Sequence, residues 1–516
     1  MKKALLVILT ALLTFTAACS GGGSSTATTA TTAATPELAP VVKPDTLIPE
    51  GFPTDDNYHE ESDFPYLVTV PDEITYCAQT GEYYLLAGDF LMRRDADTQE
   101  MTPICAKEGC LHHKEQDLSK KAECDALYTD GITLRSIYYY NERLYVTHNP
   151  ISGDDYVMTS IRVDGTDRRE ELRFPNSSML LPGMAEKGSA GTTILHRGMF
   201  YYTWARHVGD NRYALEVWVY APDKPDKDPQ CIFRTENSCL EKYDGYLTAY
   251  GTKLYLFGSY SEPGTDYIVG ASFKYLITKG EAYILDLLSG EWTAVEVPDG
   301  YDIKGQQILD GSLLISCQSF DALEQYYESL RQEAAGTSGK ENPQPSNSGT
   351  FHVLGDYVRF RLTLDGRDPV RTETMPELSD TRFVSSDERY FYKNTEEEGV
   401  PDSEELCVYD MVGNLLAQRS LADLLRKEYE LKGDSYDVEI DIIPRVLHSL
   451  GEDNAILETA EIGRWYDAGG LDHHFLRISY YYIDTKDAEN GKVELQELFS
   501  FDEVDYEGKR ISERWQ

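Results

Sequence analysis

Three cysteines and one histidine lie close together in the sequence and form a candidate metal-binding cluster. Cys105 and Cys110 have four residues between them, His112 stands two positions further on, and Cys124 follows. Three thiolates and one imidazole are a ligand set that Zn²⁺ accepts in closed, four-coordinate structural sites. The same residues also allow a disulfide between two of the cysteines, or free thiols beside an exposed His112. The sequence therefore leaves two interpretations open, a structural zinc centre and a thiol or disulfide cluster.

The cluster resembles one found in uncharacterised bacterial lipoproteins that have TolB-like propeller repeats. In that pattern a Cys-x4-Cys-x-His stretch precedes a third cysteine and a small residue. Here those positions are held by Cys105, Cys110, His112, Cys124 and Ala126. The resemblance implies an exported protein with a β-propeller body, and it brings no known activity with it.

Other motifs that would indicate chemistry are mostly absent from the sequence. It has no Gly-x-Ser-x-Gly nucleophile elbow, no phosphate-binding Gly-x4-Gly-Lys-Ser/Thr loop and no His-Glu-x-x-His zinc motif. The acidic stretch from Asp95 to Glu100 makes calcium a second candidate ion, although it lacks the central glycine of a calcium loop and a plain turn explains it better. The catalytic residues, if the protein has any, are thus not predicted.

A recurring sequence pattern, which we call the aromatic phrase, indicates the strands that hold the cluster in place. A polar turn followed by an aromatic-rich strand appears seven times, and the last copy is the weakest. The copies are TGEYYLLAG from Thr80, YNERLYVTH from Tyr140, HRGMFYYTW from His196, YGTKLYLFG from Tyr250, LDGSLLIS from Leu309, SSDERYFYK from Ser385 and EDNAILETA from Glu452.

A second phrase follows most copies and has the form of a strand, a tight Asp/Gly turn and another strand. Examples begin at Ser160, Ala282, Phe360, Cys407 and Tyr481. Glycine in such a turn supplies the positive φ that a tight hairpin needs. Four strands per unit, repeated about seven times, predict an all-β fold, a β-propeller of about seven four-stranded blades. A pair of β-sandwiches is the competing architecture.

Two segments interrupt this rhythm. Residues 321–335 have a helical pattern and precede a polar loop, which together predict a small helical insertion at about residues 319–350. A second short helix is expected from Ser420, as N-cap, to Gly433, as the C-terminal stop. Each segment either contributes to a binding face or is a solvent-exposed insertion without a binding role.

The first residues have the form of a bacterial lipoprotein signal. Lys2 and Lys3 precede an apolar stretch of about a dozen residues, which is too short to span a bilayer. The stretch ends in Thr16-Ala17-Ala18-Cys19, which resembles a lipobox. We therefore expect a signal peptide at residues 1–18, lipidation of Cys19, and attachment to the outer face of the cytoplasmic membrane or to an outer membrane.

Residues 19–49 are rich in Ser, Thr, Ala, Gly and Pro, a composition that cannot bury enough apolar surface to fold. We interpret them as a flexible tether, and residues 50–516 as the propeller domain. The whole chain carries 48 basic and 89 acidic side chains, a formal charge of −41. Such a charge disfavours nucleic-acid binding, which needs cations to displace counterions from phosphate.

The leading functional hypothesis is a membrane-anchored binding or scaffold module outside the cytoplasm that recognises a glycan, a peptide or an envelope partner. Two alternatives are an exported propeller hydrolase or lyase that acts on polysaccharide, and an envelope assembly or sensing lipoprotein. An enzyme requires acidic or histidine side chains that converge on one pocket with perturbed pKa values.

Overall fold

The computed structural model describes residues 38–505 with interruptions, of which the longest are 65–73, 175–187, 322–357, 373–383, 396–404 and 421–435. Residues 1–37 and 506–516 lie outside the described part, so the predicted signal peptide and Cys19 do as well. Within the described part, no helix has the length and apolar character needed to cross a membrane.

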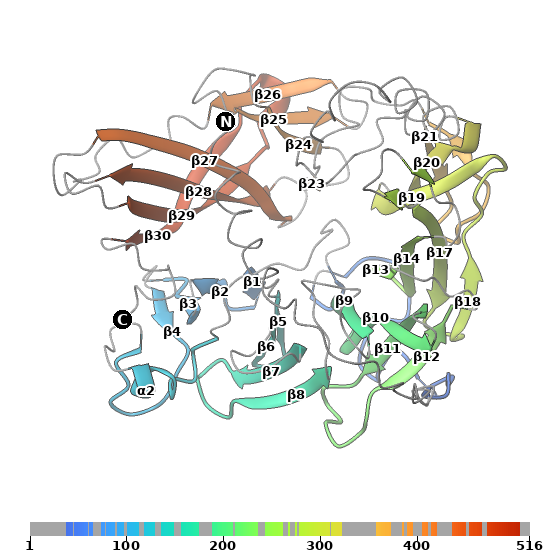
Figure 1. The fold of residues 1–516 in the computed structure, drawn as a ribbon, viewed down its shortest axis with the longest axis horizontal. Coiled ribbons are helices and arrows are strands. Elements are labelled where there is room, and N and C mark those ends of the chain that lie inside the picture. The colour runs from blue at the N-terminus through green and yellow to red at the C-terminus, as the bar shows by residue number, and fades with distance from the viewer. Residues whose placement is uncertain are drawn as a thin grey trace, which may run out of the picture. The chain divides into compact units, whose positions relative to one another are not determined.

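Four-stranded antiparallel sheets make up most of the described chain, and each is built from strands in chain order (Figure 1). The first sheet contains β1 (Ile74–Cys77), β2 (Glu82–Ala87), β3 (Phe90–Arg94) and β4 (Met101–Pro103). The second contains β5 (Ser136–Tyr140), β6 (Arg143–His148), β7 (Tyr156–Arg162) and β8 (Arg169–Phe174). The third contains β9 (Gly188–His196), β10 (Met199–Gly209), β11 (Arg212–Tyr220) and β12 (Gln230–Arg234).

The same plan continues through the rest of the chain. The fourth sheet contains β13 (Tyr243–Tyr250), β14 (Lys253–Ser261), β17 (Thr278–Asp286) and β18 (Glu291–Ala294). A two-stranded sheet of β15 (Tyr267–Ile268) and β16 (Lys274–Tyr275) lies in the connection between β14 and β17. The fifth sheet contains β19 (Tyr301–Leu309), β20 (Ser312–Ser319), β21 (Val358–Leu362) and β22 (Val370–Arg371).

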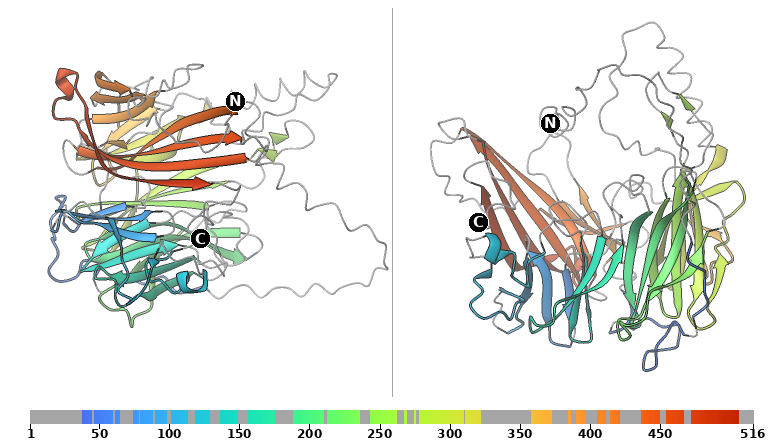
Figure 2. Two further views of the ribbon diagram at one scale, coloured as in Figure 1. Left: turned by 90° about the vertical axis from the view of Figure 1, so that its left-hand side faces the viewer. Right: turned by 60° about the horizontal axis from the view of Figure 1, so that its bottom comes forward.

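The sixth and seventh sheets complete the series. The sixth contains β23 (Val384–Ser385), β24 (Tyr390–Thr395), β25 (Glu405–Asp410) and β26 (Leu415–Ser420). The seventh contains β27 (Tyr436–Ser449), β28 (Asn454–Tyr466), β29 (Asp472–Asp484) and β30 (Glu494–Asp505), the longest described strands, in a visibly twisted sheet (Figure 2). The helices whose bounds the structure describes are α2 (Leu118–Lys121) and the 3₁₀ helix η4 (Ala488–Asn490). The all-β prediction is confirmed.

The seven copies of the aromatic phrase become the second strand of the seven sheets: β2, β6, β10, β14, β20, β24 and β28. These strands lie inside their sheets, hydrogen-bonded on both edges. In β6 every residue is buried, because both faces of the strand are covered. The strand therefore lacks the alternation of a half-exposed strand, and its aromatic and β-branched residues mark it instead.

The predicted glycine turns join the third and fourth strands of several sheets. Gly165, Gly290, Gly366 and Gly491 all have positive φ, from 69° to 82°. β21 shows the alternation expected of a strand with one covered face, because Val358, Phe360 and Leu362 are buried and the arginines between them are less so. The hairpin prediction is confirmed at these positions.

Neighbouring sheets share hydrophobic cores. One core joins the first and second sheets through residues such as Tyr84, Leu91, Ile137 and Val146. A larger core joins the second, third and fourth sheets, another the fourth and fifth, and another the sixth and seventh. Sheets that pack face to face in chain order form the repeating plan of a β-propeller, because each sheet buries its faces against its neighbours.

Residues 38–48, which composition assigns to the tether, lie along the third sheet. The amide of Val42 donates a hydrogen bond to the carbonyl of Cys231 in β12, at 2.8 Å. Leu47 and Ile48 are buried in the core that joins the second, third and fourth sheets. This described part of the predicted tether therefore packs against the third sheet.

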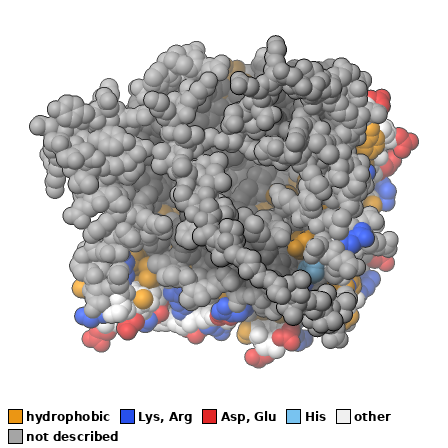
Figure 3. Space-filling model, viewed as in Figure 1, with side chains coloured by type: hydrophobic (Ala, Val, Ile, Leu, Met, Phe, Trp, Pro, Cys, Tyr) orange, Lys and Arg blue, Asp and Glu red, His pale blue; other side chains and the backbone are white. Residues whose placement is uncertain are grey.

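The two predicted helical segments lie almost wholly outside the described residues. Phe320 and Asp321 are helical, and residues 322–357 that follow are not described. Ser420, the expected N-cap, is the last residue of β26, and the helix predicted after it lies outside the described residues. On the face shown in Figure 3, the described acidic, basic and hydrophobic side chains are interspersed rather than gathered by type.

Candidate metal centre

The predicted cluster lies in a loop that leaves the first sheet and returns to it. We call residues 104–128 the cysteine loop, of which residues 113–117 are not described. At its start the amide of Ile104 donates to the carbonyl of Leu91, and at its end the amide of Leu91 donates to the carbonyl of Ala126. Leu127 also pairs with Phe90 in an isolated β-bridge. Both ends of the loop are therefore held against β3.

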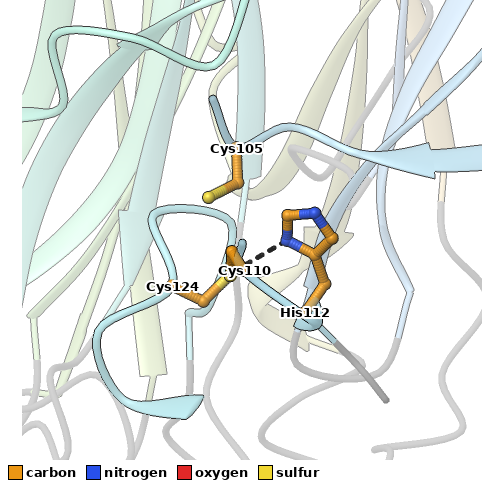
Figure 4. Close-up of side chains that lie close together, drawn as sticks. All are labelled: Cys105, Cys110, His112 and Cys124. Atoms are coloured by element: carbon orange, nitrogen blue, oxygen red, sulfur yellow. Dashed lines mark hydrogen bonds between the residues drawn. The ribbon is translucent and has the colours of Figure 1, made fainter. Parts of the chain in front are cut away.

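The four predicted ligands come together at the neck of this loop (Figure 4). The sulfur atoms of Cys105, Cys110 and Cys124 and one ring nitrogen of His112 all lie within 4.8 Å of one another. Tetrahedral Zn²⁺, with bonds of about 2.3 Å to sulfur and about 2.0 Å to nitrogen, places its ligand atoms about 3.5 to 3.8 Å apart. The distance from Cys124 Sγ to His112 Nδ1 is 3.5 Å. A contraction of about 1 Å across the widest pair would produce the tetrahedral spacing.

Tight turns bring these side chains into position. The amide of Cys110 donates to the carbonyl of Lys107, and Gly109 within that turn has a φ of 74°. His112 itself has a φ of 54°, a left-handed conformation that is uncommon outside glycine. The amide of Cys124 donates to the carbonyl of Lys121 at the end of α2. The backbone is thus folded specifically to turn these four side chains inward.

Burial favours the uncharged forms of Cys124 and His112. It raises the pKa of the Cys124 thiol to about 12, with the neighbouring thiols of Cys105 and Cys110 acting in the same direction. Burial also lowers the pKa of the His112 imidazole. Zinc binds thiolates and neutral imidazole. A metal at this site therefore displaces thiol protons, whereas the His112 imidazole is already in the neutral form that binds metal.

A cation stands beside the cluster. The Lys107 ammonium forms an ion pair with Asp125 at 2.8 Å and donates to the carbonyl of Glu123. The hydrogen bond to Asp125 raises the pKa of Lys107, with smaller contributions from Cys105 and Cys124. A zinc ion with three thiolates and one imidazole carries a net negative charge, which this ammonium would offset.

The cysteine loop is also bound to the second sheet. The amide of Ala106 donates to the carbonyl of Gly165, in the turn between β7 and β8, at 3.1 Å. From the same hairpin, Arg168 donates to the carbonyls of Asp125 and Leu127 at 2.9 and 2.8 Å. Its guanidinium lies 4.1 Å from the centre of the Tyr128 ring. The cluster therefore stands where the first and second sheets meet.

None of the described cysteines forms a disulfide. Cys77, Cys317 and Cys407 are buried away from the cluster, and Cys231 is buried with its thiol donating to the carbonyl of Phe233. Cys239 lies outside the described residues. The four-residue cluster is thus the one described group of His, Cys, Asp and Glu side chains whose ligand atoms converge on one point.

The candidate calcium stretch is only partly described. The amide of Asp97 donates to Asp95 Oδ1 at 3.0 Å, which is the hydrogen bond of an Asx turn. Residues 98–100 are not described. The described part of the stretch is therefore the plain turn.

The most deeply buried carboxylates of the described chain are held by basic or hydroxyl groups. Glu171 accepts hydrogen bonds from Ser160, Arg169 and Tyr220, and its pKa is lowered because these bonds outweigh its burial. Glu216 is fully buried and accepts from Arg206, Arg234 and Trp218. Such pairing is typical of structural ion-pair networks, in which removal of one partner leaves a buried charge uncompensated.

Another buried carboxylate, Asp63, holds the N-terminal segment in place. The fully buried guanidinium of Arg197 donates to both Asp63 oxygens, at 2.9 and 3.2 Å. It also donates to the backbone carbonyls of Pro53, Asp55 and Asn57. Every one of these acceptors lies in residues 53–63, so Arg197 fastens that segment to the turn between β9 and β10.

The sequence indicates the four cluster residues as candidate ligands, but it does not indicate the residues that hold them in place. Gly165 was visible only as a hairpin glycine, and Lys107 and Arg168 had no distinguishing signal. Lys107 acts through Asp125 and Glu123, 16 to 18 residues away. Gly165 and Arg168 act through contacts between the cysteine loop and the β7–β8 hairpin, which are tens of residues apart in the chain.

Comparison with known proteins shows no match to a family model and none to a curated protein. Similar solved structures include a prolyl endopeptidase, with 12% identity, a TM-score of 0.37 and coverage of 82% of this chain and 54% of that chain. The β-propeller domain of the Trilobed protease from Pyrococcus furiosus has 9% identity, a TM-score of 0.34 and coverage of 86% and 97%. TolB from Acinetobacter baumannii has 11% identity, a TM-score of 0.29 and coverage of 84% and 79%. The chain spans about half the length of the prolyl endopeptidase, and similarities this distant carry no conclusion about activity.

Proposed function

We propose that this chain is a lipid-anchored β-propeller outside the cytoplasm, which serves as a binding or scaffold module and contains a structural zinc centre at Cys105, Cys110, His112 and Cys124. The observation that carries the proposal is the convergence of four zinc-type ligand atoms within 4.8 Å at the junction of two sheets. Four protein ligands leave no open coordination position, so the metal supports structure rather than catalysis.

The propeller part of the proposal comprises seven blades that close into a ring. Seven four-stranded sheets in chain order support it, and so do the cores shared along the first five sheets and between the last two. Contacts between the fifth and sixth sheets and between the seventh and first would complete the ring. No described sheet mixes strands from the two ends of the chain, so side-chain packing would close it.

The anchoring part depends on the sequence of the leader. The apolar stretch before Thr16-Ala17-Ala18-Cys19 supports cleavage before Cys19 and acylation of its thiol. Since Val42, Leu47 and Ile48 contact the third sheet, the part of the tether proposed to be flexible is residues 20–37. A flexible coil of that length has a root-mean-square reach of roughly 25 Å, which keeps the body near the membrane.

The partner would be a glycan, a peptide or an envelope protein. The arginine, tyrosine and tryptophan contacts made by Glu171 and Glu216 favour a binding role over a hydrolase or lyase, since these carboxylates already have partners. An assembly or sensing role in the envelope is the remaining alternative. Glycan-array and envelope pull-down experiments with the full chain distinguish these partners.

Metal analysis tests the centre. The full-length protein, purified in detergent without chelators, is expected to contain one zinc ion per chain, and the His112→Ala and Cys124→Ala variants are expected to lose it. Cys317→Ala, which removes a buried thiol from β20, serves as the matched control and should retain the metal. A full-length protein without zinc after growth in zinc-supplemented medium would disprove the centre.

Membrane fractionation tests the anchor. The wild-type chain is expected in the membrane fraction and labelled by a fatty acid analogue, whereas Cys19→Ala should be exported without label. Equal labelling of both proteins would contradict acylation of Cys19.

A further inference from the structure

The three sulfur atoms of the cluster differ in their access to solvent. Cys124 is 2% exposed, whereas Cys105 and Cys110 are half-buried. Leu111, next to Cys110, is 54% exposed, and residues 106–109 are exposed as well. A small oxidant in solution therefore reaches the sulfur atoms of Cys105 and Cys110 before that of Cys124.

The same two cysteines have the freedom to approach each other. A disulfide needs a sulfur–sulfur distance of about 2.05 Å, closer than the spacing around a zinc ion. Only residues 106–109 separate Cys105 from Cys110, and Gly109 has open space around the position of a Cβ atom. Cys124 is more firmly held, because it follows α2 and precedes the fully buried Ala126, whose carbonyl accepts from Leu91.

We infer that Cys105 and Cys110 form an oxidation site through which a peroxide-class oxidant releases the metal and loosens the start of the cysteine loop. This inference rests on the zinc centre proposed above. With only Cys124 and His112 left as ligands, the site holds zinc too weakly to retain it. The loosening is confined to residues 104–112, since Arg168 still binds the carbonyls of Asp125 and Leu127 at the other end of the loop.

The chemical step balances with hydrogen peroxide as the oxidant. The Cys105 thiolate attacks one peroxide oxygen and the O–O bond breaks. Hydroxide is the leaving group, and Cys105 becomes a sulfenic acid. The Cys110 thiolate then attacks that sulfur, the S–S bond forms, and a second hydroxide leaves. The two sulfur atoms lose two electrons, the peroxide gains them, and Zn²⁺ passes to the solvent without a change in oxidation state.

The experiment titrates the zinc-loaded full-length protein with hydrogen peroxide and follows zinc with a colorimetric chelator. Differential alkylation and peptide mass spectrometry locate the oxidised cysteines at each point. We expect one zinc released for each Cys105–Cys110 disulfide formed, with Cys124 still alkylatable, and recovery of the centre after treatment with dithiothreitol and zinc. Cys317→Ala should behave as the wild type, since it leaves the cluster intact.

The outcomes separate the inference from the proposed centre. A protein that contains no zinc before oxidant is added disproves the centre, and the inference falls with it. If the protein contains zinc and retains it after oxidation, the oxidation site is disproved and the zinc centre stands. The same holds if the first disulfide includes Cys124. Because the mapping uses the wild-type chain, it does not depend on a variant that fails to fold.

Discussion

The amide of Ala106 lies 3.1 Å from the carbonyl of Gly165, and this hydrogen bond joins the loop that carries Cys105 to the second sheet. A Cβ atom on Gly165 would lie 2.7 Å from the Ala106 nitrogen and 2.8 Å from two backbone atoms of Cys105. These backbone atoms cannot move aside as the end of a flexible side chain can. The approach of the two segments thus depends on glycine at this position.

Gly165→Ala tests this close approach. The variant should lose stability for two reasons, the positive φ of 82° and the clash with Ala106 and Cys105. Gly300→Ala is the matched control, because Gly300 has a φ of 84° and nothing within 4 Å of its Cβ position. We expect Gly165→Ala to lose about 1 to 3 kcal/mol more unfolding free energy than the control in denaturant titrations. It should also retain less zinc during dialysis. Equal losses in the two variants would show that the approach is not close in solution.

The buried pair of Arg197 and Asp63 should contribute strongly to the attachment of the N-terminal segment. Both side chains are completely buried, so Asp63→Asn leaves the guanidinium with an uncompensated charge. We expect a loss of about 3 to 5 kcal/mol in unfolding free energy, or earlier proteolysis within residues 50–64.

Glu142→Gln is the control for that substitution. Glu142 pairs with Arg162 at 3.2 Å, but both side chains are exposed, and such pairs contribute about 1 kcal/mol or less. If Asp63→Asn proved as mild as Glu142→Gln, the segment would not be held by this pair.

His196 should make stability depend on pH. Its Nδ1 accepts from the amide of Phe64, its Nε2 donates to the carbonyl of Gly251, and burial lowers its pKa to about 4. In the unfolded chain the pKa is about 6.5, so between these values only the unfolded state holds the proton. Protonation therefore favours unfolding, and this contribution is complete above pH 6.5 and disappears as the pH falls towards 4.

The size of the effect is on the order of 3 kcal/mol between the two limits. His196→Asn keeps an acceptor for the Phe64 amide but does not titrate. The difference in stability between the wild type and this variant should shrink as the pH falls from 7 to 4. A difference that stays constant over this range would contradict a buried neutral imidazole.

Much of the fold was predictable because it repeats. Each of the seven aromatic phrases became the second strand of a sheet. In β6, which is buried throughout, large apolar residues replace the alternation of a half-exposed strand. The hairpins were predictable from Gly165, Gly290 and Gly366, because positive φ restricts the residue type. The convergence of the four cluster residues could be expected from their chemistry and short spacing, and zinc binding there stays a prediction.

The remaining features depend on contacts that are distant in the chain. Residues 38–48 look like a linker by composition, yet Val42 and Leu47 gain a hydrogen bond and burial from the third sheet. In the sequence Arg197 cannot be distinguished from a surface arginine, because its acceptors in residues 53–63 are distant in the chain. Such features carry no periodic signal, so a single sequence does not reveal them.

Hydrogen exchange at the Ala106 amide tests the central claim most directly, because this amide reports the junction that the metal is proposed to hold. The full-length protein is compared with zinc bound and after chelation, with the Leu91 amide, bonded to the Ala126 carbonyl, as an internal reference. We predict that Ala106 exchanges slowly with zinc and at least about tenfold faster without it, while Leu91 stays protected. Equal protection of Ala106 with and without zinc would show that the metal does not join the two sheets.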